Sequence, residues 1–162
     1  MKRVDKNNYY LDIAQSVTER GTCMRKNYGA VIVKDDEIIA TGYNGAPRGR
    51  KNCCDLKSCI RQKLNVPRGE RYELCRSVHA EQNAIISASR KDMINSTLYL
   101  VGIDNETGNL VENSNPCSMC KRIIINSGIK KVIIRDTKDK YREIDTKTYI
   151  DDDESVEGIS GY

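Results

Sequence analysis

Residues 29–45 read GAVIVKDDEIIATGYNG, and this stretch decides the fold. Residues 30–33 are apolar without interruption, which is typical of a strand that is covered on both of its faces. Asp35 and Asp36 predict a tight turn, and the run EIIATGY after them predicts a second strand. The stretch therefore predicts a hairpin within a sheet that has helices on both sides.

Helices and strands alternate on either side of this hairpin. The spacing of the apolar residues Tyr10, Ile13, Ala14 and Val17 predicts an amphipathic helix over about residues 6–20. An order of elements in which helices and strands alternate fits one sheet between helices. The other expected elements are a helix over 79–92, a strand over 97–103 that opens a hairpin at about 103–112, a helix over 115–128 and a strand over 130–135.

The segment between about residues 43 and 76 follows no period and is rich in Gly, Pro, Arg and Cys. So long an irregular stretch is uncommon in a compact domain unless it is functional or tied by a metal. We expect one domain over residues 1–150 that carries this Cys-rich insert. The segment 151–162, DDDESVEGISGY, is acidic and poor in large apolar residues, which predicts a disordered tail.

Composition narrows the possible partners and the compartment. The net charge of +4 comes from 27 basic and 23 acidic residues and does not demand a nucleic-acid partner. No apolar run approaches the roughly 20 residues of a membrane span, and MKRVDKNNYY lacks the apolar core of a signal peptide. We therefore expect a cytoplasmic protein without a membrane or a stable nucleic-acid partner. In a reducing cytosol, clustered cysteines are more often metal ligands or catalytic groups than disulfides, although single ones are often buried apolar residues.

His79 is the only histidine of the chain, and it stands two residues before Glu81 at the start of a predicted helix. Cys117 and Cys120 form a Cys-x-x-Cys pair behind Pro116 at the start of another. One imidazole and two thiolates are three zinc ligands of the kind that leave a fourth position open for water. A carboxylate that reaches this water can move protons, which suits Glu81 as a general acid and base.

Each half of this pattern also has a simpler explanation. A single histidine at a helix start is most often a cap or a surface residue. A Cys-x-x-Cys pair can be a redox pair or half of a structural zinc ribbon. Together, His-x-Glu followed by Pro-Cys-x-x-Cys on a second helix is the signature of zinc deaminases.

Over about residues 6–136 the chain resembles the cytidine and deoxycytidylate deaminase superfamily. The similarity rests on GAVIV, GYNGAPRG, HAEQNAI and PCSMCKRIIINSGIKKVII, which occur in the order of the family's blocks. GYNG followed by a Cys-rich insert before HAE is most similar to dCMP deaminases, including the late-competence type. The resemblance implies a cytidine-deaminase-like three-layer α/β/α fold with a mixed sheet of about five strands.

The resemblance also implies a reaction and the residues that perform it. The reaction is the zinc-dependent hydrolytic conversion of dCMP to dUMP and ammonia, with zinc on the histidine and the Cys-x-x-Cys pair. In that scheme Glu81 passes the proton of the attacking water to N3 of the pyrimidine and then to the departing ammonia. Asn44 of GYNG matches the position that contacts the nucleotide, and the backbone of Ala80 is the expected partner of the base edge.

A monophosphate substrate needs a cationic or amide-rich cradle. Arg25 and Lys26 precede the first strand, and Arg48 and Arg50 lie in the run APRGR. Arg25 is the first candidate, because similar family members carry a basic residue there. The alternative for each of these residues is a solvated surface position.

The resemblance implies two further kinds of partner. Many dCMP deaminases are hexamers that dCTP and TTP regulate. We therefore expect a homo-oligomer, up to a hexamer, with these nucleotides as candidate effectors.

The resemblance also implies a second, structural zinc ion, because some dCMP deaminases carry one in the Cys-rich region. Neighbouring residues of an extended segment point in opposite directions, so Cys53 and Cys54 are not expected to bind one ion together. Late-competence relatives resemble this chain in having cysteine at the positions of Cys53, Cys59 and Cys75. Cys54 is not among the expected ligands. Buried or free thiols are the alternative. The expected ligands of the structural zinc are Cys23, Cys53, Cys59 and Cys75.

Two other functions stay open at this point. One is a different deaminase of the same superfamily, acting on tRNA adenosine, on another nucleoside or on a free base. A tRNA enzyme would favour a more strongly basic face than this charge offers. The other is a zinc module without catalytic activity that binds nucleic acid, which predicts salt-sensitive binding and no role for Glu81.

Overall fold

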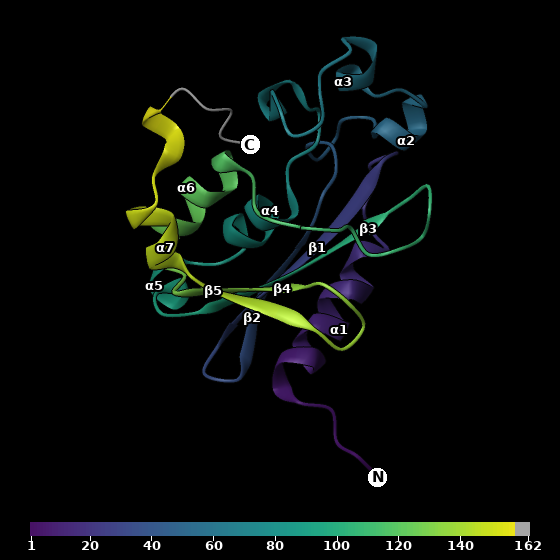
Figure 1. Cartoon of the computed structure of the whole chain (residues 1–162). Coiled ribbons are helices and arrows are strands. Elements are labelled where there is room, and N and C mark those ends of the chain that lie inside the picture. The colour runs from purple at the N-terminus through teal and green to yellow at the C-terminus, as the bar shows by residue number, and fades with distance from the viewer. Residues whose placement is uncertain (158–162) are drawn as a thin grey trace.

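The computed structural model describes residues 1–157, and the part of the predicted tail at 158–162 lies outside the described residues. A mixed five-stranded sheet forms the middle layer, in the order β2–β1–β3–β4–β5 (Figure 1). Strands β3 and β4 are parallel, and the other neighbouring pairs are antiparallel. This confirms the predicted α/β class. The strands are β1 (Lys26–Lys34), β2 (Glu37–Tyr43), β3 (Thr97–Asp104), β4 (Lys131–Arg135) and β5 (Tyr141–Asp145).

Helices cover both faces of the sheet. Side chains alternate along β1, so that Val31 and Val33 face α1 while Ala30 and Ile32 face the helices on the other side. Figure 1 shows α1 on one side of the sheet and α4, α5, α6 and α7 on the other. The helices are α1 (Lys6–Thr18), α2 (Cys53–Leu56), α3 (Ile60–Lys63), α4 (Ala80–Ile86), α5 (Arg90–Met93), α6 (Ser118–Ser127) and α7 (Thr146–Asp151), with 3-10 turns η1 (Tyr72–Leu74) and η2 (Glu154–Val156).

The predicted hairpin at 29–45 is confirmed. Strands β1 and β2 pair directly, and Asp35 and Asp36 form the two-residue turn between them with φ angles of 50° and 63°. Two left-handed residues match the right-handed twist of the flanking strands, and aspartate tolerates this conformation better than most residues.

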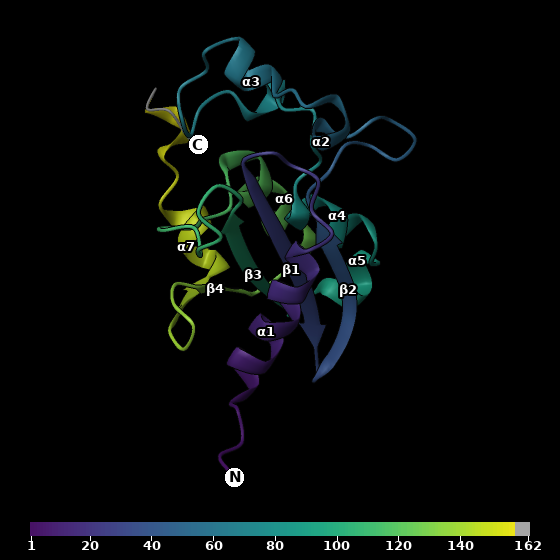
Figure 2. The ribbon, with the colours of Figure 1, turned by 90° about the vertical axis from the view of Figure 1, so that its right-hand side faces the viewer.

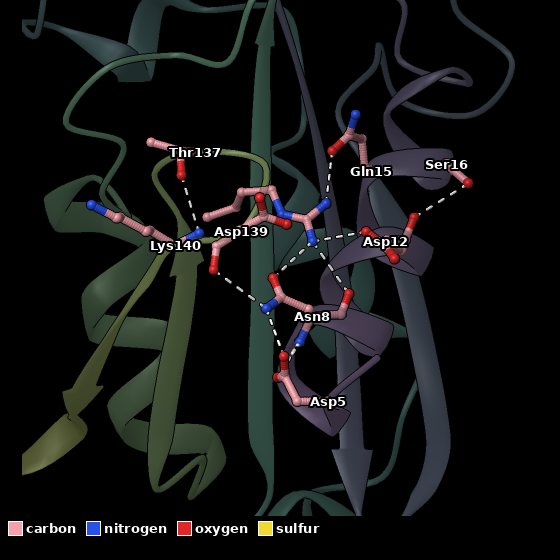
Figure 3. A network of polar contacts seen from close by, with 9 residues as sticks. Asp5, Asn8, Asp12, Gln15, Ser16, Thr137, Asp139 and Lys140 are labelled. Carbon is pink, nitrogen blue, oxygen red and sulfur yellow. Dashed lines mark hydrogen bonds and ion pairs between the residues drawn. The ribbon is translucent and has the colours of Figure 1, made fainter. Parts of the chain in front are cut away.

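A buried arginine ties α1 to the end of β4. The side chain of Arg135 is 2% exposed, and its Nη1 donates a hydrogen bond to Oε1 of Gln15 at 2.8 Å. Its Nη2 lies 2.8 Å from the carboxylate of Asp12 and 3.2 Å from the side-chain oxygen of Asn8. Figure 3 shows how these α1 side chains converge on one point. The network fixes α1 against the sheet at the edge away from the hairpin.

Two parts of the fold differ from the sequence prediction. The helix predicted over 79–92 is broken, because α4 ends at Ile86 and Ser89 caps a separate helix, α5, by accepting a hydrogen bond from the backbone of Asp92. No pattern in the sequence predicted β5 or α7. Strand β5 lies at the sheet edge, where its residues are half-buried or exposed, so it has no continuous apolar run.

The Cys-rich insert is mostly loop, with the short elements α2, α3 and η1. Figure 2 shows α2 and α3 above one end of the sheet, opposite the end at which the N-terminus lies. The predicted turn at 104–108 is present: Asp104 and Asn109 are joined by a hydrogen bond, and Ile103 bridges to Leu110. Of the helices in the described residues, none has the length and apolar character to cross a membrane.

Candidate active site

Two helix starts meet on one face of the sheet. His79 is the N-cap of α4, where its backbone N–H donates to Gln82 Oε1 at 2.9 Å. The backbones of Gly45 and Val78 pair through two hydrogen bonds, which fix the chain just before this cap. Cys117 is the N-cap of α6. Because α4 and α6 pack side by side on the same sheet face, their first residues converge.

The side chains of His79, Cys117 and Cys120 form a compact group of donors. Nδ1 of His79 lies 3.4 Å from Sγ of each cysteine. Among the described residues, only these three potential ligands gather with all their donor atoms within 4.8 Å of one another. One imidazole nitrogen and two sulfurs are a donor set that zinc prefers, and three protein ligands leave one position open.

The protons of this group are shared between the histidine and the two cysteines. Hydrogen bonds from Cys120 and from His79 lower the pKa of Cys117 to about 4, although burial opposes them. Burial lowers the pKa of His79, but hydrogen bonding to Cys117 and the charge of Glu81 outweigh it and raise that pKa to about 10. The hydrogen bond to Cys117 and burial raise the pKa of Cys120. Because zinc binds a neutral imidazole and thiolates, its binding displaces these protons.

Glu81 lies on the first turn of α4, and its side chain is buried. Burial raises the pKa of Glu81, against the charge of His79, which lowers it. A raised pKa makes the carboxylate a stronger base, which suits a group that accepts a proton and later returns it. Glu81 lines the same cavity as His79 and Cys117, which places a proton carrier beside the donor group.

The cavity has a volume of about 130 Å³ and opens between the insert and the start of β1. Ala80, Tyr28 and Asn44 line it together with the donor group. Burial, with the charge of Glu81 nearby, raises the pKa of Tyr28 to about 12, so its hydroxyl keeps its proton at neutral pH. The cavity is thus partly polar and water-accessible next to the three donors.

Cations line one wall of this cavity. Arg25, Lys26 and Arg68 all belong to its lining. Burial, the charge of Arg68 and the charge of Arg25 lower the pKa of Lys26, while Asp104 opposes them, so the three cations lie close enough to repel one another. Arg48 and Arg50, which the sequence also offered for a phosphate, are exposed and do not belong to this lining.

Asn44 lines the cavity, but its amide is engaged by the backbone of β1. Its Oδ1 accepts a hydrogen bond from the N–H of Tyr28 at 2.8 Å, and its Nδ2 donates to the carbonyl of Lys26 at 2.9 Å. The side chain therefore fixes the start of β1, which carries Lys26 and directly follows Arg25. A contact of Asn44 with a nucleotide stays a prediction.

The four cysteines predicted to hold a structural zinc do not form a closed group. Three of them line the cavity and the fourth, Cys53, is buried beside them. Burial raises the pKa of Cys53, and the charges of Cys23, Cys75 and Cys59 raise it further, so each of these three lies close enough to Cys53 to interact with its charge. Cys75 lines the cavity together with His79. The second zinc stays a prediction.

Several residues of this cavity were not predicted from the sequence, among them Tyr28 and three residues of the insert. Tyr28 lies within an apolar strand, and nothing in the sequence marks which way it faces. Arg61, Arg68 and Tyr72 come from the insert, which has no period from which a direction could be derived. Only the folded path of the insert brings them to the cavity.

Several known proteins are similar to this chain in sequence. The profile described as "Cytidine and deoxycytidylate deaminase zinc-binding region" matches residues 4–135. A protein of Mycobacterium phage D29 named deoxycytidylate deaminase is 37% identical over 138 residues, which are 82% of this chain and 96% of that protein. ComE operon protein 2 of Bacillus subtilis is 31% identical over 82% of this chain and 60% of its own length.

A solved structure is also similar. The crystal structure of a dCMP deaminase from the cyanophage S-TIM5, in complex with dCMP and dUMP, superposes with a TM-score of 0.57. It shares 26% sequence identity with this chain, and the match covers 85% of each chain. A solved chain that matches over this much of its length supports the three-layer α/β/α arrangement.

Proposed function

The chain belongs to the cytidine and deoxycytidylate deaminase family, and from this premise we propose that it converts dCMP to dUMP and ammonia by zinc-dependent hydrolysis. One observation carries the proposal: the buried carboxyl group of Glu81 lines the same cavity as His79 and Cys117, and the cations Arg25, Lys26 and Arg68 line it as well. This combination suits a small anionic substrate that receives protons from water during the reaction.

We assign the catalytic zinc to His79, Cys117 and Cys120, whose donor chemistry fits this ion. Zinc, when bound, supplies a Lewis acid that lets water ionise near neutral pH. Glu81 accepts the proton that this water loses and delivers it to N3 of the pyrimidine. The oxygen of this water forms a bond to C4. Glu81 then takes the remaining proton from the hydroxyl group on C4 and carries it to the amino group, and the C4–N4 bond breaks to release ammonia and leave the C4 carbonyl of dUMP. The backbone of Ala80 is the proposed partner of the base edge.

The phosphate of the substrate is proposed to lie against Arg25, Lys26 and Arg68. A monophosphate carries close to two negative charges at neutral pH, and hydrogen bonds between charged partners are the strong ones. The relatives named deoxycytidylate deaminase and the complex of the cyanophage enzyme with dCMP and dUMP support a nucleotide over a nucleoside. Asn44 holds the backbone of this wall and is proposed to contact the nucleotide as well.

Further parts of the proposal concern the rest of the chain. We propose that residues 1–150 form the deaminase domain, which the packing of Tyr149 against the core supports. We also propose a cytoplasmic location, because a reducing compartment keeps clustered cysteines available as metal ligands. A structural zinc on the four insert cysteines is supported by their proximity. The ligands of this second ion would be Cys23, Cys53, Cys59 and Cys75.

Self-association is also part of the proposal. A shallow hollow of about 660 Å³ lies between α4, α5 and α6, and Ile85, Met93 and Ile123 line it. Ile86, which follows Ile85 on α4, is 71% exposed and is therefore available for contact with a second copy of the chain. Sedimentation of the wild type and of Ile86→Glu tests for a homo-oligomer of up to six chains. Titration with dCTP and TTP tests these nucleotides as effectors.

A substrate panel tests the reaction itself. Ammonia release is measured with dCMP, CMP, deoxycytidine, cytosine and guanine, and Glu81→Gln serves as the inactive control. We expect dCMP to be the best substrate. Turnover of another compound in preference to dCMP contradicts the substrate, and no turnover of any compound contradicts the enzyme.

A further inference from the structure

An aromatic ring from the insert contacts the proposed zinc ligand His79. The ring centroids of Tyr72 and His79 are 5.5 Å apart, and the ring planes meet at 86°. This edge-to-face arrangement is the favoured geometry for two aromatic rings. Because the lone pair of an imidazole lies in the ring plane, any rotation of the His79 ring turns its nitrogen away from the two sulfurs.

The guanidinium group of Arg61 lies over the ring of Tyr72. Its guanidinium carbon lies 4.3 Å from the Tyr72 centroid, which is within the range of a cation–π contact. Arg61 is only 6% exposed, and its Nη2 donates hydrogen bonds to the carbonyl oxygens of Pro67 and Glu70 at 3.1 and 2.7 Å. One buried cation thus holds the loop that leads to Tyr72 and contacts the ring itself.

The backbone completes this connection. Tyr72 begins the 3-10 turn η1, and its carbonyl accepts a hydrogen bond from the N–H of Cys75 at 2.9 Å. Cys75 lines the same cavity as His79. The insert therefore reaches His79 through the ring of Tyr72, and Arg61 holds the loop that leads to this ring.

We propose that Tyr72 is a positioning residue for the metal ligand His79, and that Arg61 acts through Tyr72 to hold it in place. The inference rests on the zinc site of the proposed function. It gives the insert a role that its lack of regular structure does not suggest: the insert orients a ligand that belongs to α4. Metal ligands in proteins depend on such neighbours for their orientation.

Zinc affinity is the measurement that tests this role. The ion of interest is the one that Cys117→Ser removes, and its affinity is measured by competition with a chromophoric chelator. We expect Tyr72→Leu to weaken zinc binding about three- to tenfold, since an edge-to-face pair contributes that much. Tyr72→Phe keeps the ring and is expected to stay within about twofold of the wild type. The visible spectrum of the cobalt(II) protein should shift with Tyr72→Leu and not with Tyr72→Phe.

Arg61 is tested in the same assay. We expect Arg61→Met to weaken zinc binding about two- to fivefold. The double variant with Tyr72→Leu should bind no more weakly than Tyr72→Leu alone, because Arg61 acts through the ring. Lys63→Met removes an exposed cation from the same short helix, α3, and is expected to leave the affinity unchanged.

Several outcomes would overturn the inference. Unchanged zinc affinity and cobalt spectrum in Tyr72→Leu would do so, as would an equal loss in Tyr72→Phe. If Tyr72→Leu does not fold, equal affinities of Arg61→Met and Lys63→Met would have the same effect. A wild type that binds no zinc would overturn both this inference and the zinc site. A zinc-binding wild type without deaminase activity contradicts the proposed function only.

Discussion

Gly42 of β2 lies directly against the backbone of Ala80 at the start of α4. A Cβ atom at position 42 would stand 2.3 Å from the carbonyl oxygen of Ala80 and 2.3 Å from the amide nitrogen of Ala84. The absence of a side chain at this point lets α4 approach the sheet closely. The start of α4 carries His79 and Glu81, so this contact sets how deep both of them lie.

Gly42→Ala should therefore move the site as well as strain the core. We expect a loss of about 1–3 kcal/mol in the free energy of unfolding, because an added methyl group in a packed interior forces backbone shifts. Activity should fall even at temperatures at which the variant stays folded. Urea unfolding and steady-state kinetics measure the two effects. Thr41→Ala, at the exposed neighbouring position, is the matched control and should change neither.

Glu81→Gln should abolish deamination while zinc stays bound. The amide keeps the shape of the carboxyl group but cannot carry a proton, and a positioned acid–base group contributes about 10²–10⁴-fold to a rate. Product formation from dCMP and zinc content by mass spectrometry are measured on the same sample. Loss of zinc in this variant would show that Glu81 is a ligand, and its assigned role would be wrong.

The phosphate of dCMP should be essential for efficiency. Deoxycytidine is expected to react with a kcat/KM at least about 100-fold lower, since a charged contact left unmade costs roughly 3 kcal/mol. Arg25→Ala, Lys26→Ala and Arg68→Ala should each narrow the gap between the two substrates. Arg48→Ala, at an exposed position outside the cavity lining, is expected to leave it unchanged. Equal efficiency with both substrates would contradict the cationic wall as a phosphate site.

Metal content distinguishes one zinc site from two. We expect two zinc ions per chain in the wild type and one in a variant with Cys117→Ala and Cys120→Ala. The remaining ion would be held by the four cysteines that lie near one another around Cys53. One ion in the wild type and none in the variant would rule out the structural site and leave these cysteines as thiols.

The network around Arg135 should stabilise the fold without serving the reaction. Arg135→Met removes hydrogen bonds to Gln15 and Asn8 and the ion pair with Asp12. We expect a loss of about 2 kcal/mol in the free energy of unfolding, because hydrogen bonds to a charged group are among the stronger ones. Arg20→Met, at an exposed position just after α1, is the control. A change below about 0.5 kcal/mol would place Arg135 among ordinary surface positions.

The parts of the fold that could be predicted are those whose side chains follow a period. Residues 30–33 and 132–134 are apolar throughout because both faces of β1 and β4 are covered, and α1 shows its buried stripe at helical spacing. Strand β5 has one weakly buried face at the sheet edge, so its sequence resembles that of a loop. The break between α4 and α5 depends on the local cap at Ser89, which a continuous run of helix-forming residues conceals.

The sequence by itself determined the chemistry of the site. Its only histidine, a glutamate two residues later and a Cys-x-x-Cys pair stand at the starts of two helices, and helix starts are marked by local patterns. Only the tertiary structure decided what surrounds these groups: it selected Arg25, Lys26 and Arg68 for the wall of the cavity and left Arg48 and Arg50 outside. It also brought Tyr72 against His79. The physical reason is that the insert has no regular repeat, so the directions of its side chains are fixed by long-range contacts such as those of Arg61 and not by spacing along the chain.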